Sequence, residues 1–132
     1  MIGRALFLVF ALALPASAQS PMSAAEFEDY VSGKTLTFAT GGVTYGMEEY
    51  LSDRRVRWSF LDGECKEGVW YQRGEQICFE YEDGTGPQCW TFYRDAGSGL
   101  RARFAGDPAG TELYETEATD APMQCPGPRI GV

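Results

Sequence analysis

Histidine is absent from this 132-residue sequence, and lysine occurs only at Lys34 and Lys66. Without histidine the chain lacks the commonest general base, the Ser-His-Asp and Cys-His catalytic arrangements, and imidazole ligands for metals. No glycine-rich loop opens a predicted helix, so a phosphate-binding loop is missing as well. We therefore expect no catalytic residues, no cofactor and no bound metal.

Long hydrophobic runs are also absent, except for one of ten residues at positions 5–14. Arg4 precedes this run, and Pro15 and the small residues Ala16-Ser17-Ala18 follow it. This order is typical of a secretory signal peptide cleaved after Ala18. A membrane span needs about 20 apolar residues, so we expect removal of residues 1–18, a periplasmic or secreted protein, and no membrane insertion afterwards.

Basic residues are scarce in the remaining 114 residues, from Gln19 to Val132. Loss of Arg4 leaves 10 basic and 19 acidic side chains, a net charge of −9. Such a surface repels phosphate backbones and anionic lipids, which argues against nucleic-acid and membrane-surface partners. The length suits one domain, and we expect a monomer.

The sequence contains four cysteines, Cys65, Cys78, Cys89 and Cys125. An even number in an exported chain predicts disulfides. The spacings of 13, 11 and 36 residues contain no close pair of the kind that zinc sites use. We therefore expect all four to be oxidised, which leaves no thiolate nucleophile.

One helix is predicted, over about residues 23–32. Ser23 and Glu26 form a capping box, and Gly33 stands where a left-handed terminator belongs. Phe27, Tyr30 and Val31 make one apolar stripe on this segment.

After Gly33 the apolar residues alternate with polar ones, which is typical of antiparallel strands with one buried face. Short turn sequences separate the runs, so consecutive strands should pair as hairpins. About eight strands are expected: 34–39, 43–51, 55–61, 65–71, 75–82, 88–94, 99–105 and 111–117. This pattern predicts an all-β fold, an eight-stranded antiparallel meander barrel over residues 19–118, with an open, curved meander sheet as the alternative. Residues 119–132 should form an extended tail tied by Cys125.

Strand register suggests how the cysteines pair. If Asp83-Gly84 is the tip of a two-residue turn, Cys78 and Cys89 lie directly opposite each other, on the face away from the aromatic residues. Cys65 is then left to bond Cys125. Two other connectivities remain open, 65–78 with 89–125 and 65–89 with 78–125.

Carboxylates are the one catalytic device that the composition leaves. The candidates for a paired-carboxylate enzyme are Glu48, Glu49, Asp62, Glu64 and Glu67. Alternation along residues 43–51 points Glu48 outward and Glu49 inward. An inward Glu49 would need a partner, such as Arg54, Arg55 or a tyrosine hydroxyl. The plainer interpretation is a strand-end charge that reaches solvent.

Aromatic residues are plentiful at the predicted inward positions. They could line a ligand cavity, as in some eight-stranded barrels, or they could fill the interior, as a small domain normally requires. The residues that could line such a cavity are Trp58, Phe60, Trp70, Phe79, Trp90 and Phe92.

Four short motifs between residues 63 and 90 carry a family resemblance: Gly63-Glu64-Cys65, Gly68-Val69-Trp70, Ile77-Cys78-Phe79 and Cys89-Trp90. Over about residues 33–95 the chain resembles short exported proteins of proteobacteria that are placed in domains of unknown function. The resemblance implies a calycin- or lipocalin-like β-barrel and a periplasmic location. It implies no activity and no functional residue.

Three functions remain for this chain. The first is a binding module for a small apolar ligand or an envelope protein, favoured by the aromatic barrel without a catalytic set. The second is an inhibitor or accessory subunit of an exported hydrolase, suggested by the acidic surface and disulfide-fixed loops. The third, and least favoured, is an enzyme that uses carboxylates.

Overall fold

The computed structural model describes residues 1, 3, 9–13, 19–97, 99–107 and 109–125. It contains one α-helix, α1 (Ala24–Val31), one 3₁₀ turn, η1 (Ser52–Arg54), and eight strands. The strands are β1 (Thr35–Thr40), β2 (Val43–Tyr50), β3 (Arg55–Ser59), β4 (Lys66–Arg73), β5 (Gln76–Tyr81), β6 (Gln88–Asp95), β7 (Gly99–Phe104) and β8 (Glu112–Thr119).

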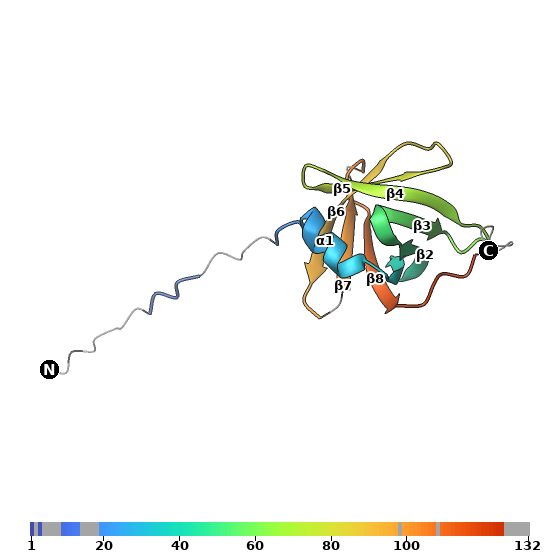
Figure 1. Ribbon diagram of the computed structural model, residues 1–132. Helices are drawn as coiled ribbons and strands as arrows, with labels where there is room; N and C mark the ends of the chain where they lie inside the picture. Colours follow the sequence, from blue (N-terminus) through green and yellow to red (C-terminus); the bar gives the residue numbers. More distant parts are fainter. Residues whose placement is uncertain (2, 4–8, 14–18, 98, 108, 126–132) are drawn as a thin grey trace.

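The eight strands form a closed antiparallel meander barrel (Figure 1). Each strand pairs with the next in the sequence, and β1 also pairs with β8, where Leu36 lies opposite Ala118. The predicted barrel is confirmed and the alternative of an open sheet is wrong. Closure removes the unpaired sheet edges that would otherwise bind other chains.

Helix α1 closes one end of the barrel. The predicted capping box is present, because the Glu26 amide donates to Ser23 Oγ at 3.1 Å and the Ser23 amide donates to Glu26 Oε1 at 3.2 Å. Phe27 is fully buried, and its ring centre lies 4.5 Å from that of Phe92 and 5.1 Å from that of Trp70. The helix therefore fills this end, which we call the closed end.

A β-bulge in β2 changes which of its side chains enter the barrel. Phe38 lies opposite Gly46, but the next residue, Ala39, lies opposite Thr44, so Tyr45 is an extra residue on β2. The extra residue reverses the alternation beyond it. Glu48 therefore points into the barrel and Glu49 points out, which is the reverse of the orientation predicted from the sequence.

Both disulfides connect the predicted partners, Cys78 with Cys89 and Cys65 with Cys125, with Cα–Cα distances of 4.0 and 5.8 Å. Cys78 and Cys89 are directly opposed, as the register predicts. The tight turn on which that register was based is wrong, because β5 ends at Tyr81 and β6 begins only at Gln88. The same register therefore holds with a wider loop.

The segment after β8 returns along the outside of the barrel to Cys65. Ala121 O accepts a hydrogen bond from Thr35 Oγ1 at 2.8 Å, and Met123, which is buried, donates from its amide to Glu49 Oε2 at 3.3 Å. Strand β8 continues to Thr119, so the segment starts one residue later than predicted. The end of the predicted tail, residues 126–132, lies outside the described residues.

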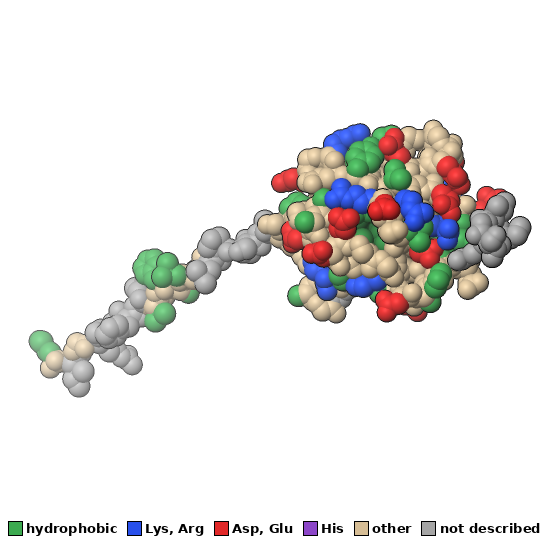
Figure 2. Space-filling model, in the orientation of Figure 1, with side chains coloured by type: hydrophobic (Ala, Val, Ile, Leu, Met, Phe, Trp, Pro, Cys, Tyr) green, Lys and Arg blue, Asp and Glu red, His purple; other side chains and the backbone are tan. Residues whose placement is uncertain are grey.

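The molecular surface carries both signs of charge. Figure 2 shows Asp and Glu side chains scattered among Lys and Arg over the face on which α1 lies. In the part of the chain that the structure describes, no helix is long and apolar enough to cross a membrane.

Candidate functional site

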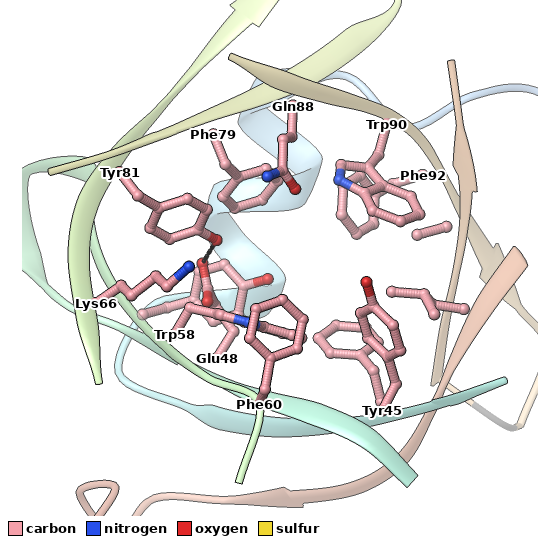
Figure 3. Close-up of a pocket in the computed structure, with 14 residues that line it drawn as sticks. Tyr45, Glu48, Trp58, Phe60, Lys66, Phe79, Tyr81, Gln88, Trp90 and Phe92 are labelled. Carbon is pink, nitrogen blue, oxygen red and sulfur yellow. Dashed lines mark hydrogen bonds between the residues drawn. The ribbon is translucent and has the colours of Figure 1, made fainter. Parts of the chain in front are cut away.

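The end of the barrel opposite α1 is open and contains a cavity (Figure 3). The cavity has a volume of about 50 Å³, and the empty space including its mouth is about 530 Å³. Nine of the fourteen described residues that line it are aromatic. The lining residues are Phe38, Tyr45, Glu48, Tyr50, Trp58, Phe60, Lys66, Phe79, Tyr81, Gln88, Trp90, Phe92, Ala102 and Leu113.

Five of the six aromatic residues proposed from the sequence lie around this cavity: Trp58, Phe60, Phe79, Trp90 and Phe92. Trp70 does not. It packs edge-on against Phe27 at the closed end, and the Arg54 guanidinium lies 4.4 Å from its ring centre. The sequence left open whether the aromatic residues fill the barrel or line a cavity. In the structure they pack together under α1 and line a cavity at the mouth.

Two glycines make room for large rings in the cavity wall. A Cβ atom on Gly46 would lie 2.4 Å from the Trp58 indole. A Cβ atom on Gly68 would lie 2.8 Å from the Tyr81 ring and 2.4 Å from the Glu80 carbonyl oxygen. These approaches are closer than van der Waals contact allows, so glycine is required at both positions if Trp58 and Tyr81 are to keep their places.

Glu48 is the one carboxylic acid among the described residues that line the cavity, and its residue is only 2% exposed. Its Oε1 accepts a hydrogen bond from the Tyr81 hydroxyl at 2.8 Å, shown as a dashed line in Figure 3. Its Oε2 is buried and has no hydrogen-bond partner. Burial raises the pKa of Glu48 well above its ordinary value of 4.5, although the Tyr81 hydrogen bond opposes this shift.

The tyrosines beside Glu48 stay neutral in the physiological range. Burial raises the pKa of Tyr81, and the negative charge of Glu48 raises it further. Burial also raises the pKa of Tyr50, and the charges of Glu48 and Glu115 add to the effect. Burial therefore favours the neutral, protonated form of Glu48, the one carboxyl among the described residues that line the cavity.

The mouth of the cavity is aromatic, and the lysine at its edge is paired with a carboxylate. The rings of Tyr45, Trp58 and Phe60 contact one another, with centres 5.3–5.8 Å apart. Lys66 Nζ pairs with Asp83 Oδ2 at 2.7 Å, and this hydrogen bond lowers the pKa of Asp83 to about 2.

The other candidate carboxylates do not join Glu48. Glu49 and Glu67 both bind the Arg57 guanidinium outside the barrel, at 2.9 and 2.7 Å. The prediction that Arg54 or Arg55 would pair with Glu49 is therefore wrong, because Arg57 does so. A tyrosine hydroxyl, the third partner considered, donates to Glu48 instead: it is that of Tyr81. Asp62 and Glu64 are exposed in the loop between β3 and β4, where Asp62 Oδ1 accepts from the Glu64 amide at 3.1 Å. A carboxylate pair across the cavity is not formed by the described residues.

Several cavity residues were missed by sequence reasoning. In the sequence, Tyr81 follows the predicted inward positions Ile77 and Phe79, and Tyr45 follows the predicted inward position Val43. Both tyrosines could therefore have been included among the predicted cavity-lining residues. Glu48 was expected to point outward because regular alternation was assumed along β2, and the one local sign of the bulge at Tyr45 is the neighbouring glycine, Gly46. Among the residues that the structure describes, no cluster of three or more His, Cys, Asp or Glu side chains is placed to hold a metal ion.

Comparisons of the chain with protein-family models, curated protein sequences and solved structures found no match. The resemblance to short exported proteobacterial proteins therefore stays a prediction. What the molecule can bind has to be inferred from the chemistry of its own site.

Proposed function

We propose that this protein binds a small, largely apolar molecule in the open end of its barrel. The observation that carries the proposal is a buried carboxyl, Glu48, with one unpartnered oxygen inside an aromatic-walled cavity. Cavities that combine apolar walls with one or two placed polar groups are typical of small-molecule sites. Leaving a buried polar atom unpaired costs about 1–3 kcal/mol, so the arrangement suits a bound group better than an empty space.

The closed end supports this proposal, because it shows that the chain can fill a barrel interior. Phe27 is fully buried under α1, whereas large rings at the mouth leave a hollow. Gly46 and Gly68 hold that hollow in shape by admitting Trp58 and Tyr81 to its wall. A ligand of a few heavy atoms fits the narrow part, and a larger group would extend into the mouth.

We also propose that the domain works outside the cytoplasm after removal of residues 1–18. Two disulfides are compatible with an extracellular or periplasmic protein. Val9, Phe10 and Leu12 are exposed, whereas the Gln19 side chain accepts a hydrogen bond from Arg101 at 2.6 Å and donates to the Arg94 carbonyl at 2.5 Å. Intact mass measurement of the exported protein should give a chain that begins at Gln19 and contains two disulfides.

The ligand-binding proposal is tested by titration with benzyl alcohol, monitored by NMR of the tryptophan indole N–H groups. The three tryptophans form an internal control, because Trp58 and Trp90 line the cavity and Trp70 lies at the closed end. The Trp58 and Trp90 signals should move with a common saturation curve while the Trp70 signal stays in place.

A filling variant sharpens this test. Ala102 is buried in the cavity wall, so Ala102→Leu should reduce the binding. Ala118→Leu, which adds the same atoms at an exposed position on β8, should leave it intact. Equal movement of all three indole signals, or none, would count against a site at the open end.

A second candidate function, an inhibitor or accessory subunit of an exported hydrolase, is favoured by the exposed apolar side chains near the mouth. Val43, Leu61 and Phe60 are 67, 52 and 44% exposed. Exposed apolar side chains beside disulfide-tied loops suit a protein partner. If this function holds, Leu61→Asp should abolish inhibition of the partner hydrolase and leave the indole titration unchanged.

A further inference from the structure

The chemical character of the ligand can be inferred from the unpartnered oxygen of Glu48. Its other oxygen, Oε1, accepts from Tyr81 at 2.8 Å, so a ligand has only Oε2 to meet. An ionised carboxylate oxygen accepts hydrogen bonds and pairs with cations, whereas a protonated one donates to a neutral acceptor. The surroundings of Glu48 decide between these two partners.

We propose that the open end of the barrel binds an organic cation, a protonated amine on an apolar or aromatic body, whose ammonium group pairs with Oε2 of Glu48. This inference rests on the proposed ligand-binding function and specifies its ligand class. The aromatic body would lie in the mouth, against Tyr45, Trp58 and Phe60.

The walls of the cavity favour a positive charge. The faces of aromatic rings carry partial negative charge, and a cation within about 6 Å of a ring centre is attracted by about 0.5–2 kcal/mol. Trp58, Phe60 and Tyr81 line the same cavity as the Glu48 carboxyl (Figure 3), and Lys66 Nζ already lies 5.3 Å from the centre of the Phe60 ring. The ring that meets the lysine at the mouth can meet a ligand cation in the same way.

The loops around the mouth are acidic. The connections 60–65, 82–87 and 105–111 contain five carboxylic acids and no Lys or Arg: Asp62, Glu64, Glu82, Asp83 and Asp107. Lys66 is the one basic residue among the described cavity-lining residues, and Asp83 pairs with it. The resulting negative potential attracts cations to the cavity and repels anions.

Cation binding should be coupled to proton release. Without a ligand, the raised pKa of Glu48 favours its neutral acid form. Pairing with an ammonium ion requires the carboxylate, so the carboxyl proton leaves to solvent while Tyr81 continues to donate to Oε1. The other charged or titratable groups that face the cavity are Tyr45, Tyr50, Tyr81 and Lys66, and of these Tyr50 and Tyr81 have raised pKa values while Lys66 is held by Asp83.

The experiment compares four probes that share one benzyl or phenyl body: benzylammonium, benzyltrimethylammonium, benzyl alcohol and benzoate. Binding is measured through the indole signals of Trp58 and Trp90. We expect benzylammonium to bind at least about tenfold more tightly than benzyl alcohol, and benzoate to bind most weakly. Affinity for benzyltrimethylammonium, whose charge is independent of pH, should rise with pH as Glu48 loses its proton.

Glu48→Gln separates charge from shape, because the amide oxygen can still accept the Tyr81 hydrogen bond. This variant should bind benzylammonium and benzyl alcohol with similar affinity and should lose the pH dependence. Glu80→Gln, an exposed residue on β5, removes the same charge outside the cavity and should behave as the parent protein.

Each outcome distinguishes the two proposals. Equal binding of cation and alcohol by the parent protein, or preference for the alcohol, would overturn the cation inference and leave the ligand-binding function standing. Saturable cation binding that Glu48→Gln does not weaken would also overturn the inference, because the charge would then be recognised elsewhere. Failure of all four probes to move either indole signal would overturn both proposals.

Discussion

Both ends of the barrel are rich in aromatic residues, but one end is packed and the other contains a cavity. At the closed end, Phe27 packs against four aromatic rings, three of which also form the floor of the cavity, and two polar side chains beside it have partners. The Tyr30 hydroxyl donates to the Glu115 carboxylate at 2.8 Å, and Arg54 pairs with Glu28 at 3.1 Å. At the open end, equally large rings surround a hollow, and a buried carboxyl oxygen has no partner.

This difference lies in the packing and in the pairing of polar groups within one small domain. The buried rings and paired charges at the closed end stabilise the barrel. The open end gives up part of that stability, because a cavity forfeits packing contacts and an unpaired buried oxygen costs free energy. Under the ligand-binding proposal, the ligand would supply the missing contacts.

The largest contrast between the ends should appear when one ring is removed from each. Phe27→Ala removes the centre of the closed end and should lower the free energy of unfolding by about 3–5 kcal/mol. Phe60→Ala removes a ring that is 44% exposed at the mouth, so its loss should be about 1 kcal/mol. Urea unfolding of both variants measures the two values. Similar losses would mean that the two ends are equally well packed.

The next largest loss of stability is expected on the outer face of the barrel, where Arg57 of β3 pairs with carboxylates of the neighbouring strands. Arg57 binds Glu49 and Glu67, and Glu49 also accepts the Met123 amide. Arg57→Gln should cost about 2–3 kcal/mol, because it leaves the buried Glu49 carboxylate without its cation.

Arg55→Gln is the matched control for this variant. Arg55 lies on the same strand but bonds only Ser52 in an exposed position, so its loss should stay within about 0.5 kcal/mol. If the two variants unfold at the same urea concentration, the Arg57 pair contributes nothing beyond an ordinary surface charge.

Sequence patterns predicted the strands and the helix better than the places of individual side chains. Apolar alternation recurs in every hairpin, so the eight strands and the closed barrel followed from it. The capping box at Ser23 predicted α1 for the same reason, since its signature is local. The position of Trp70 under α1, away from the cavity, depends on where the helix packs, which no local pattern encodes.

The central residue of the site was predicted with the wrong orientation. Alternation places Glu48 outside if β2 is regular, and the bulge at Tyr45 reverses it. The bulge appears only in the pairing of β1 with β2, where Phe38 lies opposite Gly46 and Ala39 opposite Thr44. The functional hypothesis therefore required the three-dimensional register, whereas the aromatic lining did not.

The smallest expected change in the free energy of unfolding gives the most direct comparison, because it concerns two adjacent residues of the same type. Glu48 and Glu49 are 2 and 6% exposed, on opposite faces of β2. At pH 8, Glu48→Gln should raise the free energy of unfolding by about 1 kcal/mol, since it removes a buried carboxyl that lacks a charged partner. Glu49→Gln should lower it by about the same amount, since it removes half of an ion pair.

The pH dependence identifies Glu48 as the cause. Its pKa is raised in the folded protein, so between pH 4.5 and the raised value the folded chain holds a proton that the unfolded chain has lost. The unfolded state then binds fewer protons, and the free energy of unfolding falls as the pH rises through this range. The advantage of Glu48→Gln over the parent should therefore vanish near pH 4 and grow toward pH 8. Urea unfolding at both pH values measures it, and an advantage that stays constant with pH would show that Glu48 is not the buried, unpaired acid on which the binding site depends.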